Sequence, residues 1–118
     1  GKYIGKPKLI KKMIKFFNLQ KIFIVNDDIM NLPKYRKKFN KISFIYIDCN
    51  VFKVVDMILN ELSHKISKGG VIAFDEARNK FNKDEGKAMM KFYMKNKKNY
   101  KLLRLNANYQ PDAILIKK

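Results

Sequence analysis

The 118-residue sequence has no tryptophan, one cysteine, three prolines and five glycines. A single cysteine, Cys49, cannot form an internal disulfide, so a reducing compartment is the default and we expect a cytoplasmic protein. No apolar run approaches the roughly 18 residues that a transmembrane helix needs, so we expect no membrane insertion. No Pro-, Gly- or Ser-rich linker interrupts the chain, and its length therefore predicts a single domain over residues 1–118.

Acidic residues are also scarce, because 10 Asp and Glu stand against 27 Lys and Arg, a formal net charge of +17. Such a protein can bind nucleic acid, an anionic membrane surface or a phosphorylated substrate. The only arginines are Arg36, Arg78 and Arg104, whereas base-edge and bidentate phosphate recognition favours arginine. Because the lysines are spread along the whole chain, we favour a solvated lysine surface over a nucleic-acid partner. A basic module for anionic surfaces stays open as an alternative.

Apolar runs alternate with helical patterns along the chain, which predicts an α/β fold with a mostly parallel sheet flanked by helices. Three central runs show little alternation, as expected for strands that are covered on both faces. We expect these strands at residues 21–25, 43–47 and 71–74, and two more at 101–105 and 113–116 that form an antiparallel edge pair.

Helical patterns fill the segments between these runs, and the pair Gly69-Gly70 is expected to stop and turn the chain. Asp84 is a plausible N-cap of the last helix. The first helix places apolar residues on one face and lysines on the other, so it either covers a core or lies on a membrane surface. The predicted helices are 7–18, 33–38, 51–66 and 84–97.

Half of the scarce acidic residues follow directly on predicted strands. They are Asp27, Asp28, Asp48, Asp75 and Glu76. The carboxyl ends of parallel strands line the ligand crevice of an open sheet, so negative charge is expected at one rim of a strongly positive molecule. Carboxylates held close together repel one another, and a cation, hydrogen-bond donors or lysines must compensate.

Two interpretations of these acidic residues remain open. Asp48, Asp75 and Glu76 come from neighbouring strands, and three carboxylates suit a hard divalent ion such as Mg²⁺. Alternatively, Asp48 and Asp75 simply cap the turns or helices that follow them. Asp27 or Asp28 could accept hydrogen bonds from the nucleoside of a cofactor.

Several motifs then occur in a fixed order along residues 21–118. They are Val25-Asn26-Asp27-Asp28-Ile29 before Leu32-Pro33-Lys34-Tyr35, Ile47-Asp48-Cys49-Asn50-Val51-Phe52, Lys68-Gly69-Gly70 before a strand ending Asp75-Glu76, and Asp84-Glu85-Gly86-Lys87-Ala88. In this order and spacing they resemble the C-terminal part of the macrocin O-methyltransferase family, class I enzymes that use S-adenosylmethionine (SAM) and have a Rossmann-like fold.

This resemblance implies a SAM-dependent O-methyltransferase that acts on a sugar or related diol. It implies that Asp48, Asp75 and Glu76 hold a Mg²⁺ ion, which binds two substrate oxygens and lowers the pKa of the hydroxyl that is methylated. The family's general base falls on Asn50, which cannot accept a proton at neutral pH. Either the metal alone activates the hydroxyl, another carboxylate such as Glu76 serves as base, or catalysis is impaired.

The family's Gly-rich SAM-binding loop and first two strands have no counterpart in these 118 residues. The resemblance therefore implies the C-terminal portion of a longer methyltransferase domain, inactive and without measurable SAM affinity when isolated. The isolated chain then either pairs 21–25 directly with 42–47 or leaves a strand edge open. An open edge would favour self-association, so a homo-oligomer is a further expectation. The competing interpretations are a basic binding module and a non-catalytic methyltransferase-like remnant.

Overall fold

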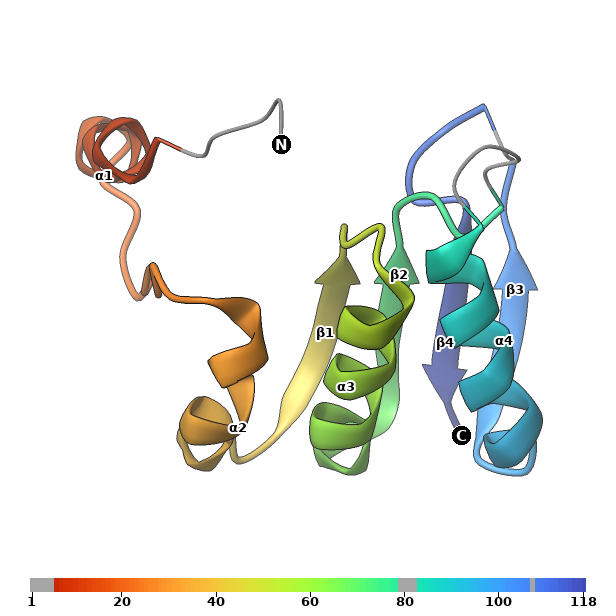
Figure 1. Ribbon diagram of the computed structural model, residues 1–118. Coiled ribbons are helices and arrows are strands. Elements are labelled where there is room, and N and C mark those ends of the chain that lie inside the picture. Colours follow the sequence, from red (N-terminus) through yellow and green to blue (C-terminus); the bar gives the residue numbers. More distant parts are fainter. Residues whose placement is uncertain (1–5, 79–82, 107) are drawn as a thin grey trace.

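The computed structural model describes residues 6–78, 83–106 and 108–118 (Figure 1). Its helices and strands alternate in the order expected of an α/β chain. The α-helices are α1 (Pro7–Phe16), α2 (Leu32–Tyr35), α3 (Phe52–Leu62) and α4 (Asp84–Asn96), and 3₁₀ turns cover Ile29–Asn31, Arg36–Lys38 and Ser63–Lys65. The strands are β1 (Ile42–Ile47), β2 (Ile66–Phe74), β3 (Tyr100–Arg104) and β4 (Ala113–Lys117).

The four strands form one mixed sheet in the order β1-β2-β4-β3. β1 and β2 are parallel, which requires the crossover that α3 provides, whereas β4 runs antiparallel to both β2 and β3. The predicted α/β class and the antiparallel pair at the C-terminal edge are confirmed. Only one of the pairings is parallel, because the run at 21–25 does not join the sheet.

One face of the sheet forms the core against α3 and α4, which lie side by side in front of the strands in Figure 1. Ile72 of β2 and Leu115 of β4 are partners in the ladder, and both are fully buried. The apolar residues of α3 recur every three or four positions, which places them on the side that meets the sheet. The buried residues of this helix are Val55, Ile58, Leu59 and Leu62.

The opposite face of the sheet is only partly covered by the residues that the structure describes. Ladder partners on this face include Phe44 with Val71 and Tyr46 with Ala73. Phe44 is 58% exposed, and Ala73, although buried, lies outside the main core cluster. The expectation that the central strands are covered on both faces is therefore correct for one face only. We call this surface the open sheet face: Phe44, Tyr46, Val71, Ala73, Leu103, Ile114 and Ile116.

The predicted strand at 21–25 is wrong. This segment has neither helix nor strand structure, and its side chains point largely into solvent, with Phe23 90% exposed. An apolar run becomes a strand only when a neighbouring strand satisfies its backbone hydrogen bonds. Among the described residues β1 pairs with β2 alone, so the other edge of β1 is open.

Helix α1 is confirmed as an amphipathic helix, but it covers no core in the described structure. None of its residues is buried, and Leu9, Met13 and Phe16 are all at least half exposed. Figure 1 shows α1 at one side of the molecule, apart from the layer formed by α3 and α4.

Two local predictions near the strands and helices need correction. Gly69-Gly70 was expected to stop and turn the chain, but the pair lies within β2. Gly69 has a φ of +78° there. The ladder register shifts there, from Ile42 opposite Ile66 to Phe44 opposite Val71. Lys83 takes the N-cap position of α4, and Asp84 is the first residue of the helix.

Candidate functional site

The ends of β1 and β2 bring three of the predicted site residues to one end of the sheet. Asp48 follows β1, and Asp75 and Glu76 follow β2. The backbone N–H of Asp75 donates to the carbonyl oxygen of Ile47 at 2.9 Å, which extends the parallel ladder to this point. We call Asp48, Asp75 and Glu76 the strand-end cluster.

The charges in the strand-end cluster act on one another. The pKa of Asp48 is raised above its ordinary value, first because the carboxyl is partly desolvated and then because Asp75 and Glu76 are negative neighbours. The ion pairs formed among the described residues involve other acidic groups, namely Glu61, Asp84 and Asp56. Asp48 is therefore an exposed carboxylate with raised proton affinity.

Asp75 is the most buried member of the cluster, with 9% of its surface exposed. Its Oδ1 accepts a short hydrogen bond from the hydroxyl of Tyr46, the β1 residue two positions before Asp48. This hydrogen bond is the main reason why the pKa of Tyr46 is raised to about 12. The tyrosine therefore remains a neutral donor and holds the Asp75 carboxylate in one orientation.

Glu76 meets two amide side chains at the outer side of the cluster. Asn50 Nδ2 donates to Glu76 Oε2 at 3.5 Å, and Gln110 Nε2 donates to Glu76 Oε1 at 3.4 Å. Both hydrogen bonds are long, so they restrain the carboxylate only weakly. Asn50, the residue at the family's base position, thus lies beside the cluster and is exposed.

A fourth carboxylate, Glu85 in the first turn of α4, was not predicted as a site residue. It is 0% exposed, and its two oxygens accept hydrogen bonds from the backbone N–H groups of Cys49 and Glu76. Burial raises the pKa of Glu85, and the two backbone hydrogen bonds oppose that rise. The signal was present in the sequence, because Glu85 shares its helix face with the apolar Ala88 and Met89, three and four positions later.

The cluster does not form a ready metal site. Within the described ranges, no three His, Cys, Asp or Glu side chains are grouped so that they could hold a metal ion. The orientations explain this result, because the Asp75 carboxylate is held by Tyr46 and Glu85 is turned toward the backbone. The predicted Mg²⁺ site on Asp48, Asp75 and Glu76 is thus not supported, although the three residues do share one end of the sheet.

Asp27 and Asp28, predicted to bind the cofactor, serve local structure. Asp27 accepts hydrogen bonds from the Tyr35 hydroxyl at 2.7 Å and from Asn31 Nδ2 at 2.9 Å, and these bonds lower its pKa. Asp28 caps the 3₁₀ turn by accepting from the N–H of Met30. The hollow beside them measures about 150 Å³, below the roughly 300–1,000 Å³ typical of ligand pockets.

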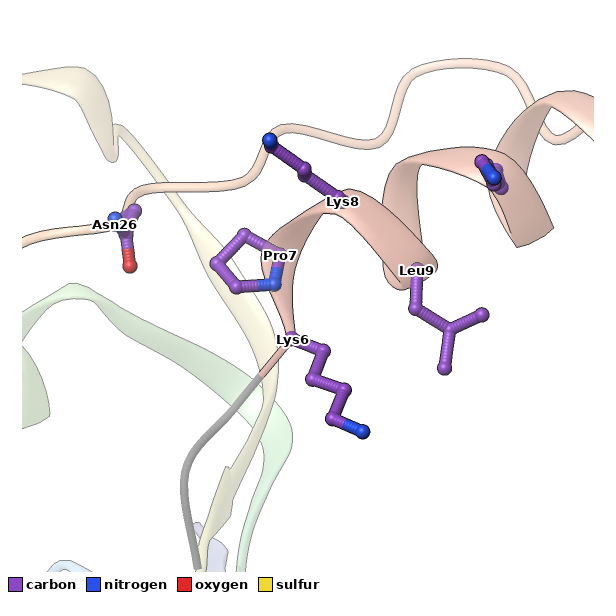
Figure 2. A pocket seen from close by; sticks show the side chains of 6 residues that line it. Lys6, Pro7, Lys8, Leu9 and Asn26 are labelled. Carbon is purple, nitrogen blue, oxygen red and sulfur yellow. The ribbon is translucent and has the colours of Figure 1, made fainter.

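A larger hollow, of about 620 Å³, lies where α1 meets the segment around Asn26. Its lining comprises Lys6, Pro7, Lys8, Leu9, Lys12 and Asn26, and includes no member of the strand-end cluster. Figure 2 shows that the side chains of Lys6, Lys8 and Leu9 point in different directions rather than toward one centre. This hollow is an open depression and lacks converging polar groups.

Comparison with solved structures identifies the fold. The apo structure of CalS11, a TDP-rhamnose 3'-O-methyltransferase in calicheamicin biosynthesis, superimposes with a TM-score of 0.70 at 19% identity, over 99% of this chain and 54% of that one. Fibrillarin from Methanococcus jannaschii, a pre-rRNA processing protein, gives 0.54 at 14% identity. Fibrillarin from Aeropyrum pernix, with natively bound SAM, gives 0.56 at 14% identity. Each fibrillarin alignment covers 94% of this chain and 51% of the other.

These similarities show a class I methyltransferase fold and do not by themselves define an activity. No protein-family model matches the sequence, and no curated protein matches it either. The chain spans about half the length of the solved structures that it resembles. The described residues include no helix that is both long and apolar enough to span a bilayer.

Proposed function

We propose that the chain contributes the acceptor-binding half of a SAM-dependent O-methyltransferase, of the macrocin O-methyltransferase type, that acts on a sugar or related diol. One observation carries this proposal. The strand-end cluster gathers carboxylates at the carboxyl ends of β1 and β2, within a fold shared with a sugar O-methyltransferase. In open α/β sheets, ligands bind in the crevice outside the carboxyl ends of the strands.

The chemistry requires a hydroxyl to attack a methyl carbon. SAM, when bound, supplies that methyl group on a sulfonium, whose C–S bond breaks as the new C–O bond forms. We assign proton acceptance to Asp48, because it is exposed and its pKa is raised, first by partial desolvation and then by its acidic neighbours. Asp75 and Glu76 accept hydrogen bonds from the acceptor's neighbouring hydroxyls and orient it. The arrangement assigns no step to a metal ion.

Asn50 distinguishes this site from the family pattern. Its side chain lies beside Glu76, so an aspartate there would place a second base next to the acceptor. We expect Asn50→Asp to raise the rate of methyl transfer in an otherwise competent enzyme. An unchanged or lower rate in a SAM-dependent assay would count against the assignment of this position to proton transfer.

Calorimetry tests whether the part of the domain outside this chain is needed to bind SAM. We expect no measurable SAM affinity for the 118-residue chain alone, because the Gly-rich loop and first two strands of the family pattern have no counterpart in these residues. Micromolar binding of SAM would show that this chain holds the whole cofactor site.

A second candidate function, binding to anionic membrane surfaces, is favoured by α1. The helix has no acidic residue and presents exposed apolar side chains beside its lysines, the pattern of a helix that lies in a membrane interface. The test is co-sedimentation with vesicles. Binding to phosphatidylserine vesicles, with loss in a Lys11→Glu/Lys15→Glu variant, supports this function, and equal binding to neutral phosphatidylcholine vesicles argues against it.

A further inference from the structure

Glu85 is the most completely buried acidic side chain that the structure describes, at 0% exposed. An ionised carboxylate without partners is strongly destabilised in a protein interior. Here each oxygen has one partner: Oε2 accepts from the N–H of Cys49 at 3.2 Å, and Oε1 accepts from the N–H of Glu76 at 2.9 Å. The two donors belong to different segments, one after β1 and one after β2.

We propose that Glu85 is a positioning residue that fixes the distance between the two segments carrying the strand-end cluster. Cys49 lies between Asp48 and Asn50, and Glu76 is itself a member of the cluster. A single rigid carboxylate that bonds to both backbones therefore sets how far apart the acceptor-binding side chains stand. The role of Glu85 in methyl transfer rests on the proposed function, but its contact with the two backbone segments can be tested without measuring activity.

The first turn of α4 is well placed to hold such a carboxylate still. Gly86 follows Glu85, and a Cβ at that position would lie 1.9 Å from the carbonyl oxygen of Ala77. The helix backbone thus sits directly against the segment that follows Glu76. On the other side of Glu85, Ala88, Met89 and Phe92 anchor the helix in the core.

Charge does not explain the position of Glu85. The charged groups that act on it, Asp75 and Asp48, are both negative, and each raises its pKa rather than lowering it. The backbone hydrogen bonds are therefore the interactions that favour an ionised Glu85 in this place. Glu85 keeps its two backbone hydrogen bonds although two negative side chains lie near it. A carboxylate with such a perturbed environment is typical of a functional site.

Amide hydrogen exchange measured by NMR tests the geometry. In the wild-type chain we expect the amides of Cys49 and Glu76 to be protected. In Glu85→Gln the side chain keeps one acceptor oxygen and gains a donor, so it can serve only one of the two N–H groups. We expect at least one of these amides to exchange about tenfold faster, corresponding to roughly 1.4 kcal/mol, while Ile72 and Leu115 keep their protection.

Asp84→Asn is the matched control, because it removes the same charge from the same helical turn. Among the described residues, Asp84 makes an exposed pair with Lys87 at 3.7 Å. It should leave the Cys49 and Glu76 amides unchanged. Unprotected wild-type amides at these positions would overturn the proposal, and this holds even if Glu85→Gln fails to fold. An equal loss of protection at every amide in Glu85→Gln would also overturn it, because that result describes general stability.

A kinetic readout separates this inference from the proposed function. In the full natural protein, Glu85→Gln should lower kcat for methyl transfer at least tenfold and leave the KM for SAM unchanged. If no methyl transfer occurs in the wild type, the proposed function fails, while protection of the two amides would still show the positioning contact. An unchanged kcat in Glu85→Gln, in an active enzyme, overturns the positioning role.

Discussion

Individual carboxylates in this chain differ in what their surroundings do to them. Asp56 lies 2.9 Å from the ammonium of Lys91, whereas Asp48 faces the negative charges of Asp75 and Glu76. The negative charge of Asp56 is stabilised by Lys91, whereas the negative charge of Asp48 is destabilised by its acidic neighbours. In a protein with an excess of lysines, the strand-end cluster is a local exception to the overall charge.

Replacement of Asp48 by asparagine should therefore stabilise the fold at neutral pH. The folded-state pKa of Asp48 is raised, so the group favours folding only below its unfolded pKa of about 3.8 and disfavours it once ionised. We expect Asp48→Asn to increase the free energy of unfolding at pH 7 by at most about 1 kcal/mol, because the group is exposed. In urea denaturation the gain should shrink as the pH falls toward 3, and Asp56→Asn should instead destabilise at pH 7.

The hydroxyl of Tyr46 affects stability at alkaline pH, whereas the effect of Asp48 changes at acidic pH. Its pKa is raised from 10.0 to about 12 by its hydrogen bond to Asp75, so the bond stabilises the fold fully below pH 10. The contribution declines as the pH rises toward 12. Tyr46→Phe should reduce stability at pH 8, and the difference from wild type should narrow above pH 10. Tyr109→Phe, at an exposed position, is the control and should show little difference at either pH.

At the scale of elements, secondary structure was predictable where a segment carries its own pattern. The apolar spacing of 51–66 was sufficient to predict α3, although the helix ends at Leu62. The runs at 43–47 and 71–74 lie within β1 and β2, and β2 begins earlier, at Ile66. The run at 21–25 is similarly apolar but has no neighbouring strand among the described residues. Composition alone could not reveal that difference, because strand formation depends on partners distant in sequence.

The candidate site was predictable to the same extent. Strand ends identified Asp48, Asp75 and Glu76 correctly as neighbours, since parallel strands place their carboxyl ends together. The orientations of Asp75 and Glu85 were not predictable, because they are set by the Tyr46 hydroxyl and by the two backbone N–H groups that Glu85 accepts from. Because these hydrogen bonds orient the carboxylates, the cluster does not form a three-ligand metal group among the described residues.

The junction between β2 and α4 gives a prediction at this scale. Gly86→Ala should destabilise the chain by about 1–3 kcal/mol, because the added methyl group would collide with the Ala77 carbonyl. Gly69 differs, since it has open space around it but a φ of +78°. Gly69→Asn should be tolerated, because asparagine adopts this conformation readily. Urea denaturation compares the two variants, and a neutral Gly86→Ala would contradict the close packing seen here.

At the scale of the whole molecule, the chain exposes more surface than its mass requires. Its accessible surface is 9096 Å² at 14.0 kDa, whereas a compact monomer of that mass exposes about 6,700 Å². The radius of gyration of 15.0 Å likewise exceeds the roughly 13.5 Å expected for a compact domain of this length. The open sheet face, the free edge of β1 and α1 are the visible sources of this excess.

This excess predicts that the isolated chain associates with itself. Light scattering after size exclusion, in about 0.15 M salt to screen the positive charge, should give a mass above 14.0 kDa that rises with concentration. Phe44→Lys, on the open sheet face, should lower that mass. Met94→Lys, at a similarly exposed position on α4, should not. A monomer at every concentration would refute the prediction.

The most direct test of the account is methyl transfer by the full natural protein that carries these residues. Labelled SAM should be incubated with nucleotide sugars that offer neighbouring hydroxyls, and transfer of the label should be measured for wild type, Asp48→Asn, Asp75→Asn and the control Asp56→Asn. We predict transfer by the wild type and the control, and at least a hundredfold loss in both strand-end variants. Transfer that survives in those variants, or no transfer by the wild type to any diol, would contradict the assignment of this site.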